Sequence, residues 1–261
     1  MMHRDLIALR EKAIPSLLEA RSRHVDYRHY SIDTSSNYFG EELVDITTLG
    51  VRGRNYYNRT DNPPYYESIP GSLSGLYLRA TVARKLAGVD RRLHDLGLRV
   101  FVHDAFRPIE VQRYFHDTWM PARVRRRYPH FDEAQVMKET EIYWAKPSES
   151  ELSPSPHGSG GALDVTLAFA ESGDLLHMGS IFDDACVLAS TDYFEPHRDA
   201  LQRDSDDEAR ANRRVLYWVM TDAGFANYPN EWWHFSWGDQ MWAKMAGERA
   251  AHYGLAPMPG G

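Results

Sequence analysis

Residues 155–167 read SPHGSGGALDVTL, in which a glycine-rich turn leads into alternating apolar and polar residues. This alternation has the period of two that is typical of a β-strand, and it places Leu163 and Leu167 on one face and Asp164 on the other. We therefore expect a strand over residues 162–169 with an apolar face in the core and a polar face that presents Asp164.

The flanking sequence predicts elements of both kinds. A second alternating run ends near Asp104, so that Arg107 follows directly after the end of a strand. Other segments show helical spacing of apolar residues or an aromatic alternation. The expected elements are a helix over 76–96, a strand over 98–104, helices over 109–128 and 208–222, and a strand over 231–237. This mixture predicts an α+β fold.

The size of the chain predicts a single domain. With 261 residues and 43% hydrophobic content, it can bury a substantial core, and no long linker tract divides it. Residues 1–26 are expected to form an amphipathic helical extension before a domain over 27–261. Charged residues interrupt the apolar stretch that a signal peptide needs, and no apolar run approaches about 18 residues, so we expect a cytoplasmic protein with no membrane partner.

Charge and cysteine content exclude further classes. The net charge of −7 comes with no long basic stripe, which argues against a nucleic-acid partner. Because Cys186 is the only cysteine, neither an intrachain disulfide nor a zinc site of several thiolates can form. Any transition-metal site must therefore use histidine and carboxylate ligands.

Two short segments supply such ligands. His157 and Asp164 flank one turn, and the segment NEWWHFSW adds His234 with Glu231 three residues before it. Catalytic zinc sites typically use three nitrogen or oxygen ligands and keep one position open. Residues three apart on a regular strand point to opposite faces, so Glu231 must lie at the strand entry or on a bulge if it is to face the same metal.

These residue types together favour metal-assisted hydrolysis. Zinc lowers the pKa of bound water to about 7, and an unligated carboxylate such as Glu231 can then take up its proton. The oxyanion formed on a peptide carbonyl needs a second positive partner, and Arg107 is a permanently charged, forked donor. We predict Glu231 as general base and Arg107 as oxyanion partner.

Each residue also has a purely structural interpretation. His157 or His234 alone is more often a surface or core histidine, Asp164 can cap a turn, and Arg107 can form a surface ion pair. The tryptophans Trp232, Trp233 and Trp237 favour core packing. A cysteine or serine hydrolase has little support, because the apolar run around Cys186 predicts a buried thiol and Ser155 lacks a nucleophile elbow.

Two motifs resemble those of a known family. Ser-x-His-x-x-Gly-x-Ala-x-Asp is filled by residues 155–164 and Glu-x-Trp-His by residues 231–234. Together with DAFRP and LLHMGSIFDD, they make the chain similar to the VanX-type D-Ala-D-Ala dipeptidases over roughly residues 27–238. The resemblance implies a central antiparallel sheet and one zinc ion per chain, bound by His157, Asp164 and His234.

The resemblance also implies roles for the remaining site residues. Glu231 matches the family's base, Arg107 its transition-state arginine and Ser155 a substrate-contacting serine, while Asp183 matches an aspartate near the free amino group of a small dipeptide. A carboxylate is the natural partner of that ammonium. Residues 50–74 and 123–153 are longer than in compact members, which predicts a different pocket mouth.

Two other functions remain open from the sequence. A D,D-carboxypeptidase or endopeptidase acting on cell-wall peptides would use the same ligands, but it needs an open groove where Asp183 would close the amino-terminal side. A non-catalytic binding module with structural zinc would need four protein ligands, whereas three are found here. We therefore favour zinc-dependent hydrolysis of D-Ala-D-Ala or a similar short dipeptide.

Overall fold

The computed structural model describes residues 3–144, 146–195 and 203–260. The α-helices are α1 (Arg4–Glu11), α2 (Leu18–Arg23), α3 (Ala80–His94), α4 (Ile109–Arg113), α5 (Met120–Arg127), α6 (Glu133–Tyr143), α8 (Asp204–Asp222) and α9 (Gln240–Ala246). The shorter helical turns are η1 (Tyr27–His29), η2 (Ile46–Leu49), η3 (Tyr114–Trp119), η4 (His157–Ser159) and η5 (Val187–Ala189). The strands are β1 (Leu43–Asp45), β2 (Arg52–Gly53), β3 (Tyr77–Arg79), β4 (Leu98–Asp104), β5 (Ala162–Phe169), β6 (Ala226–Asn227) and β7 (His234–Ser236).

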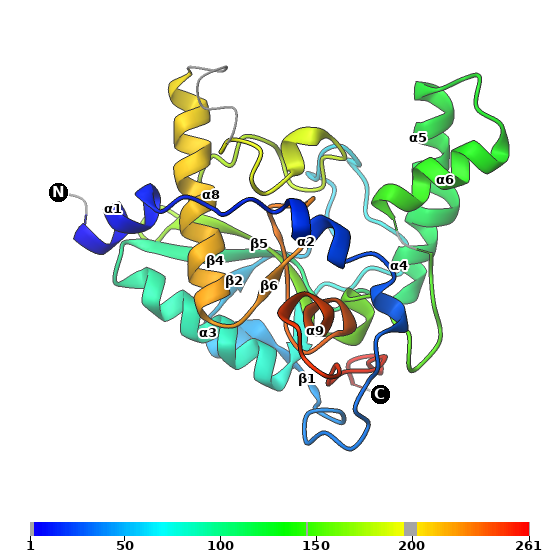
Figure 1. Cartoon of the computed structure of the whole chain (residues 1–261), viewed down its shortest axis with the longest axis horizontal. Coiled ribbons are helices and arrows are strands. Elements are labelled where there is room, and N and C mark those ends of the chain that lie inside the picture. The colour runs from blue at the N-terminus through cyan, green and yellow to red at the C-terminus, as the bar shows by residue number, and fades with distance from the viewer. Residues whose placement is uncertain (1–2, 145, 196–202, 261) are drawn as a thin grey trace.

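A five-stranded sheet lies at the centre of the molecule. Its strand order is β2-β4-β5-β7-β6, and β1 and β3 form a separate antiparallel pair. All neighbours in the larger sheet are antiparallel except β2, a two-residue edge strand that runs parallel to β4. Helices α3 and α8 lie on one side of this sheet, while α5 and α6 project away from it (Figure 1). The predicted mixed fold with a central antiparallel sheet is confirmed.

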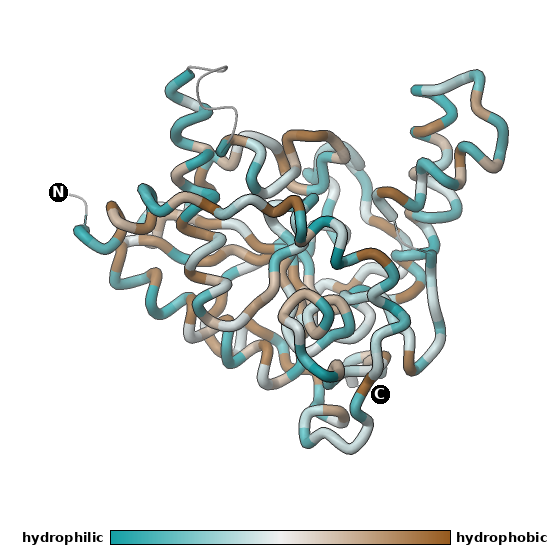
Figure 2. The backbone as a smooth tube through the Cα atoms, viewed as in Figure 1, coloured by the Kyte–Doolittle hydropathy of each residue, from teal (hydrophilic) through white to brown (hydrophobic). Residues whose placement is uncertain are grey.

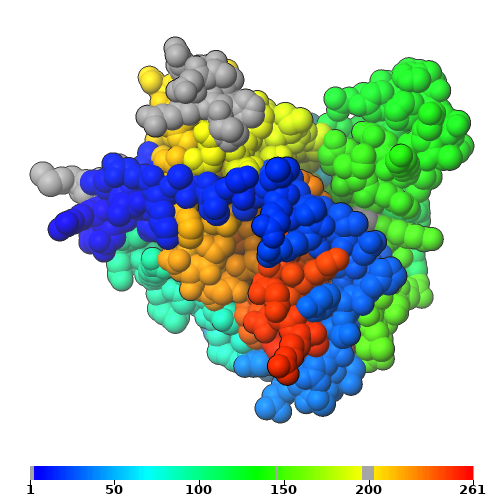
Figure 3. Space-filling view, viewed as in Figure 1, coloured from blue at the N-terminus to red at the C-terminus, as the bar shows by residue number. Residues whose placement is uncertain are grey.

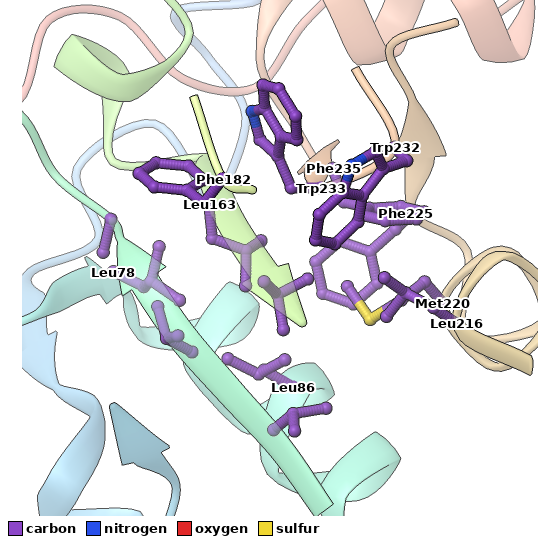
Figure 4. Packing of buried hydrophobic residues seen from close by; sticks show 14 of the residues in the cluster. Leu78, Leu86, Leu163, Phe182, Leu216, Met220, Phe225, Trp232, Trp233 and Phe235 are labelled. Atoms are coloured by element: carbon purple, nitrogen blue, oxygen red, sulfur yellow. The ribbon is translucent and has the colours of Figure 1, made fainter. Parts of the chain in front are cut away.

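The two faces of the sheet differ in polarity as the alternation predicts. Leu163 on β5 packs in one buried cluster with Leu86 on α3 and Met220 on α8 (Figure 4). Apolar residues concentrate along these inner elements and hydrophilic residues along their outer surfaces (Figure 2). The opposite face of β5, which includes Asp164, is therefore left for the polar residues of the site.

A bulge in β4 changes which residues reach that polar face. Val102 pairs with Val165 in the core, but the register then shifts so that Asp104 lies opposite Asp164. Without the shift, strand parity would place Asp104 with Val102 on the apolar face. The extra residue thus moves a buried carboxylate from the core side to the site.

The amino-terminal segment differs from the predicted single helix. It forms α1 and α2 with an irregular connection around Pro15, because proline removes a backbone donor and disfavours a helical residue before it. Residues 4–23, here called the N-terminal strap, run across α8 (Figure 3). Arg10 donates a 2.8 Å hydrogen bond to Asn212, and the Trp218 indole N–H donates to the Lys12 carbonyl oxygen at 2.9 Å.

Other predicted elements are confirmed with shifted bounds. The helix expected over 76–96 begins at Ala80, because residues 77–79 pair with β1 instead. The helix expected over 109–128 is interrupted by the π-helical turn η3, and the final strand covers only 234–236. The three tryptophans near that strand are buried, as expected for core packing. Cys186 is half-buried rather than buried, because its segment runs along the surface beside exposed Val187.

Candidate metal centre and active site

Three potential metal ligands meet on the polar face of the sheet. His157 lies in η4 directly before β5, and the antiparallel register pairs Asp164 of β5 with His234 of β7. His157 Nε2 lies 3.2 Å from His234 Nδ1 and 3.4 Å from Asp164 Oδ2, while His234 Nδ1 lies 3.1 Å from Asp164 Oδ1. All three side chains are buried, and together they form a cluster that can bind a metal ion.

The fixed orientation of His157 suits a ligand. Its Nδ1 lies 2.8 Å from the carbonyl oxygen of Ala105, an acceptor that requires the proton to be on Nδ1. The lone pair of Nε2 then faces Asp164 and His234. Such a hydrogen bond to the distal ring nitrogen is the usual way in which a protein sets the tautomer of a metal-binding histidine.

The separations within the cluster fit one zinc ion. Zinc bonds to imidazole nitrogen or carboxylate oxygen are about 2.0–2.2 Å long, which places the ligand atoms of a tetrahedral site about 3.3–3.6 Å apart. The observed separations of 3.1–3.4 Å are close to this range. Within the described residues the cluster has three members, the number that leaves a fourth position for water or substrate.

Glu231 lies beside the cluster rather than in it. It precedes β7 by three residues, so of the two positions that the parity argument allowed, strand entry or bulge, it occupies the strand entry, and its Oε2 is 4.0 Å from His234 Nδ1. Burial and the nearby carboxylates of Asp164 and Asp183 raise the pKa of Glu231 to about 8. A divalent cation at the ligands lowers that pKa again, because opposite charge favours the ionised form.

Arg107 connects the end of β4 to the ligand cluster. Its Nε donates to Asp104 Oδ2 at 2.8 Å, and its Nη2 donates to Tyr57 Oη at 3.2 Å and to Asp164 Oδ2 at 3.4 Å. The guanidinium also lies over the ring of Trp144, 4.9 Å from its centre. Burial opposes the charge, but Tyr57 and the two aspartates outweigh burial and raise the pKa of Arg107, so it remains a cation.

Asp183 lies on another wall of the same site. It adopts a left-handed backbone conformation with φ of 63°, and the phenols of Tyr57 and Tyr65 donate to its Oδ2 at 2.8 Å and 2.5 Å. Burial raises the pKa of Asp183 to about 6. With both phenols on Oδ2, the Oδ1 atom can accept from a further donor.

One cavity of about 120 Å³ brings all seven predicted residues together. Ser155 lies at its edge, where its Oγ accepts the backbone N–H of Gly158 at 3.1 Å. The remaining six are lining residues of the same cavity: Arg107, His157, Asp164, Asp183, Glu231 and His234. Residues from four separate stretches of the sequence therefore meet in one place, which is not expected if each were an independent surface or structural residue.

The chain matches a family model over this whole region. The Peptidase M15 model described as D-ala-D-ala dipeptidase matches residues 76–251. A D-alanyl-D-alanine dipeptidase of Synechocystis sp. is 31% identical over 224 residues, covering 80% of this chain and 87% of that protein. The chain belongs to the D-Ala-D-Ala dipeptidase family. The resemblance found in the sequence motifs is confirmed, and the chain is a peptidase.

Other relatives of the chain differ in how similar they are to it in sequence. A D-alanyl-D-alanine dipeptidase of Streptomyces coelicolor is 29% identical, covering 76% of this chain and 89% of that protein. Among solved structures, a mutant of the VanY D,D-pentapeptidase in complex with Zn(II) is 15% identical with a TM-score of 0.39, covering 68% of this chain and 83% of that one. VanYB in complex with D-Alanine-D-Alanine is 17% identical with a TM-score of 0.40, covering 77% and 94%.

The site of this chain also contains residues that were not predicted from the sequence. Asp104 pairs with Arg107, and Tyr57 and Tyr65 contact Asp183 from the irregular segment 50–74. The only sequence signal for Asp104 was its position as a carboxylate at the end of an apolar alternation.

Among the described helices, none combines the length and apolar character that crossing a membrane requires.

Proposed function

We propose that this chain is a zinc-dependent dipeptidase that hydrolyses D-Ala-D-Ala, with His157, Asp164 and His234 as ligands and Glu231 as general base. The observation that supports this most strongly is the position of the Glu231 carboxylate, 4.0 Å from a ligand nitrogen and outside the ligand cluster. A structural zinc site does not require such an unligated, partly buried carboxylate beside the ligands. Membership in the D-Ala-D-Ala dipeptidase family supports the substrate.

The cavity offers one polar partner for each end of a dipeptide. When bound, zinc supplies a Lewis acid that polarises the peptide carbonyl and an attacking water. Asp183 accepts the substrate ammonium, and Ser155 at the cavity edge positions the other end of the dipeptide.

Two residues of the chain then act on the reacting atoms. Glu231 takes a proton from water and delivers it to the leaving amine, so this one residue acts first as general base and then as general acid. Arg107 donates to the oxygen on which negative charge develops, and its contacts to Asp104 and Asp164 hold the guanidinium in place. Interactions that strengthen as the oxyanion forms accelerate the reaction rather than merely bind substrate.

The rival peptidase functions make different demands on the same site. A carboxypeptidase or endopeptidase must accept a substrate whose amino group is already acylated, and this leaves no cation for Asp183. Asp183 is partly buried, and a carboxylate shielded from water is stabilised by a contacting cation, so Asp183 favours a free ammonium. A zinc-stabilised binding module is disfavoured because the cluster formed by the described residues has three members rather than four.

The decisive experiment measures alanine release from D-Ala-D-Ala by the purified chain with zinc and with a chelator. L-Ala-L-Ala and N-acetyl-D-Ala-D-Ala are the matched substrates. We expect chelator-sensitive cleavage of the free D,D-dipeptide and little cleavage of the other two. Efficient cleavage of the acetylated substrate would assign a carboxypeptidase instead, and bound zinc without any cleavage would favour the binding module.

A further inference from the structure

A second cavity of about 270 Å³ opens beside the catalytic cavity. Its apolar part, here called the annex, is lined by Trp119, Met120, Ile142, Ala185, Val187 and Ala189. These residues come from the projecting α5 and α6 region and from the segment around η5, which Figure 1 shows as separate green and yellow parts of the chain. Neither the ligands nor the base require this space.

The annex adjoins the catalytic cavity along a shared wall. Seven residues line both cavities, and Asp183, Glu231 and Trp233 are among them, so this wall includes the proposed ammonium partner and the proposed base. In a bound dipeptide, the α-carbon of the first residue lies between its ammonium and its reacting carbonyl. The side chain on that carbon would therefore leave the catalytic cavity where the annex begins.

The chemistry of the annex is apolar with a negative border. Met120 and Ala189 are buried in its wall, whereas Ile142 and Val187 remain 58% and 70% exposed at its rim. Among the described residues that line the whole cavity around the annex, the charged groups are the carboxylates of Asp183, Asp184 and Glu231, and no lysine or arginine is present. Such a space favours an apolar group attached to a cation and disfavours an acidic one.

We infer that the annex binds the side chain of the substrate's first residue, so that this chain accepts D,D-dipeptides whose amino-terminal residue is large and apolar. This inference rests on the proposed dipeptidase function and specifies its substrate class. A methyl group fills little of a cavity of about 270 Å³, since a water molecule occupies about 30 Å³ of liquid. A leucine-sized side chain would fill more of this space and would shield the exposed apolar side chains of Ile142 and Val187 at the rim.

A peptide extension is the competing occupant of the annex. It would require an acylated amino group beside Asp183, whose carboxylate is partly buried and receives hydrogen bonds from two tyrosines. Those phenols are neutral donors and do not neutralise the charge. A free ammonium does, so the annex follows a charged amino terminus rather than a continuing chain.

The test compares kcat/KM for D-Ala-D-Ala, D-Leu-D-Ala and D-Glu-D-Ala in the zinc-loaded protein. We expect D-Leu-D-Ala to exceed D-Ala-D-Ala by about tenfold, within the range for added apolar groups in a specificity pocket, and D-Glu-D-Ala to be the poorest. Ala185→Phe places a ring in the annex and should reduce the tenfold ratio to about one. Ile181→Phe is the matched control, because Ile181 is exposed in the same segment and does not line either cavity.

A D-Leu-D-Ala to D-Ala-D-Ala ratio of one or less in the wild type, or a ratio that Ala185→Phe leaves unchanged, would overturn the inference. Cleavage of N-acetyl-D-Ala-D-Ala as fast as D-Ala-D-Ala would do the same, because it would give the annex to a peptide extension. A second readout is the dissociation constant of each dipeptide from the metal-free protein, measured from the change in tryptophan fluorescence, since Trp119 and Trp233 line this cavity.

The binding readout separates the two levels of inference. If no dipeptide is cleaved, the proposed function fails, but the dissociation constants still test whether the annex binds the side chain of the first residue. Tighter binding of D-Leu-D-Ala than of D-Ala-D-Ala, lost in Ala185→Phe and kept in Ile181→Phe, supports the annex. Equal dissociation constants for the two dipeptides reject it.

Discussion

Replacing Arg107 with methionine is expected to destabilise the metal-free protein by about 3–5 kcal/mol, the usual cost of removing one partner from a buried ion pair. The guanidinium lies 2.8 Å from Asp104 and 3.4 Å from Asp164, and the two aspartate side chains are only 1% and 3% exposed. Methionine keeps an apolar stem over Trp144 but leaves both carboxylates without their cation. At about 2 °C per kcal/mol for a chain of this length, Tm should fall by about 6–10 °C.

The size of this deficit should depend on pH in a defined direction. Burial already raises the pKa of Asp104, and loss of Arg107 raises it further. A carboxyl group whose pKa is higher in the folded than in the unfolded state binds more protons when folded, so its contribution to stability is lost as pH rises. The Arg107→Met variant should therefore lose more stability at pH 8 than at pH 5.

Thermal unfolding of the chelator-treated protein at both pH values measures this effect. Arg113→Met is the control, because Arg113 pairs with Glu149 on the surface, where such a pair contributes about 0–1 kcal/mol. Adding Asp104→Asn to Arg107→Met should recover part of the lost Tm, since it removes one uncompensated charge. A Tm within about 2 °C of the wild type at pH 8, or a deficit that is the same at both pH values, would refute the reasoning.

Four further outcomes are expected. Glu231→Gln should retain zinc by metal analysis but reduce kcat by about 10²–10⁴-fold, since the base is lost and the ligands are intact; unchanged turnover would remove Glu231 from the mechanism. His234→Ala should lose zinc on dialysis, and a full equivalent of zinc afterwards would exclude it as a ligand. Burial raises the pKa of Asp183 to about 6, so a pH profile should show KM for D-Ala-D-Ala rising below that pH, as Asp183 becomes protonated. Asp183→Asn should have a high KM at every pH and no such rise. A rise that persists in this variant would assign it to another group. Chelation should lower Tm, because zinc that binds only the folded state stabilises it; an unchanged Tm would contradict a bound metal.

The strands and the ligand cluster were predictable because they depend on local periodicity. The alternation over residues 162–169 indicated the face of Asp164, and the same parity argument limited Glu231 to the entry or a bulge of the strand that contains His234. Both statements need only the geometry of one strand. The motif spacing then added His157 at the turn before it.

The residues that escaped prediction depend on irregular or long-range structure. Asp104 reaches the site only through the register shift in β4, which no periodicity in the sequence signals. Tyr57 and Tyr65 contact Asp183 across more than a hundred residues of sequence, from a segment without regular hydrogen-bonding. Pro15 is itself a signal for a break, but the amphipathic pattern of the N-terminal segment favoured one continuous helix.

The N-terminal strap has a consequence for the order in which the chain folds during synthesis. Its Arg10 bonds to Asn212, 202 positions later, so the strap cannot dock until α8 has left the ribosome. The ligand cluster must wait longer still, because its third member is His234. A nascent chain that exposes only His157 and Asp164 lacks the third proposed ligand, so a metal ion bound at that stage would have at most two of the three. Docking of the strap and completion of the proposed metal centre therefore both wait for the synthesis of α8 and of the strand that follows it.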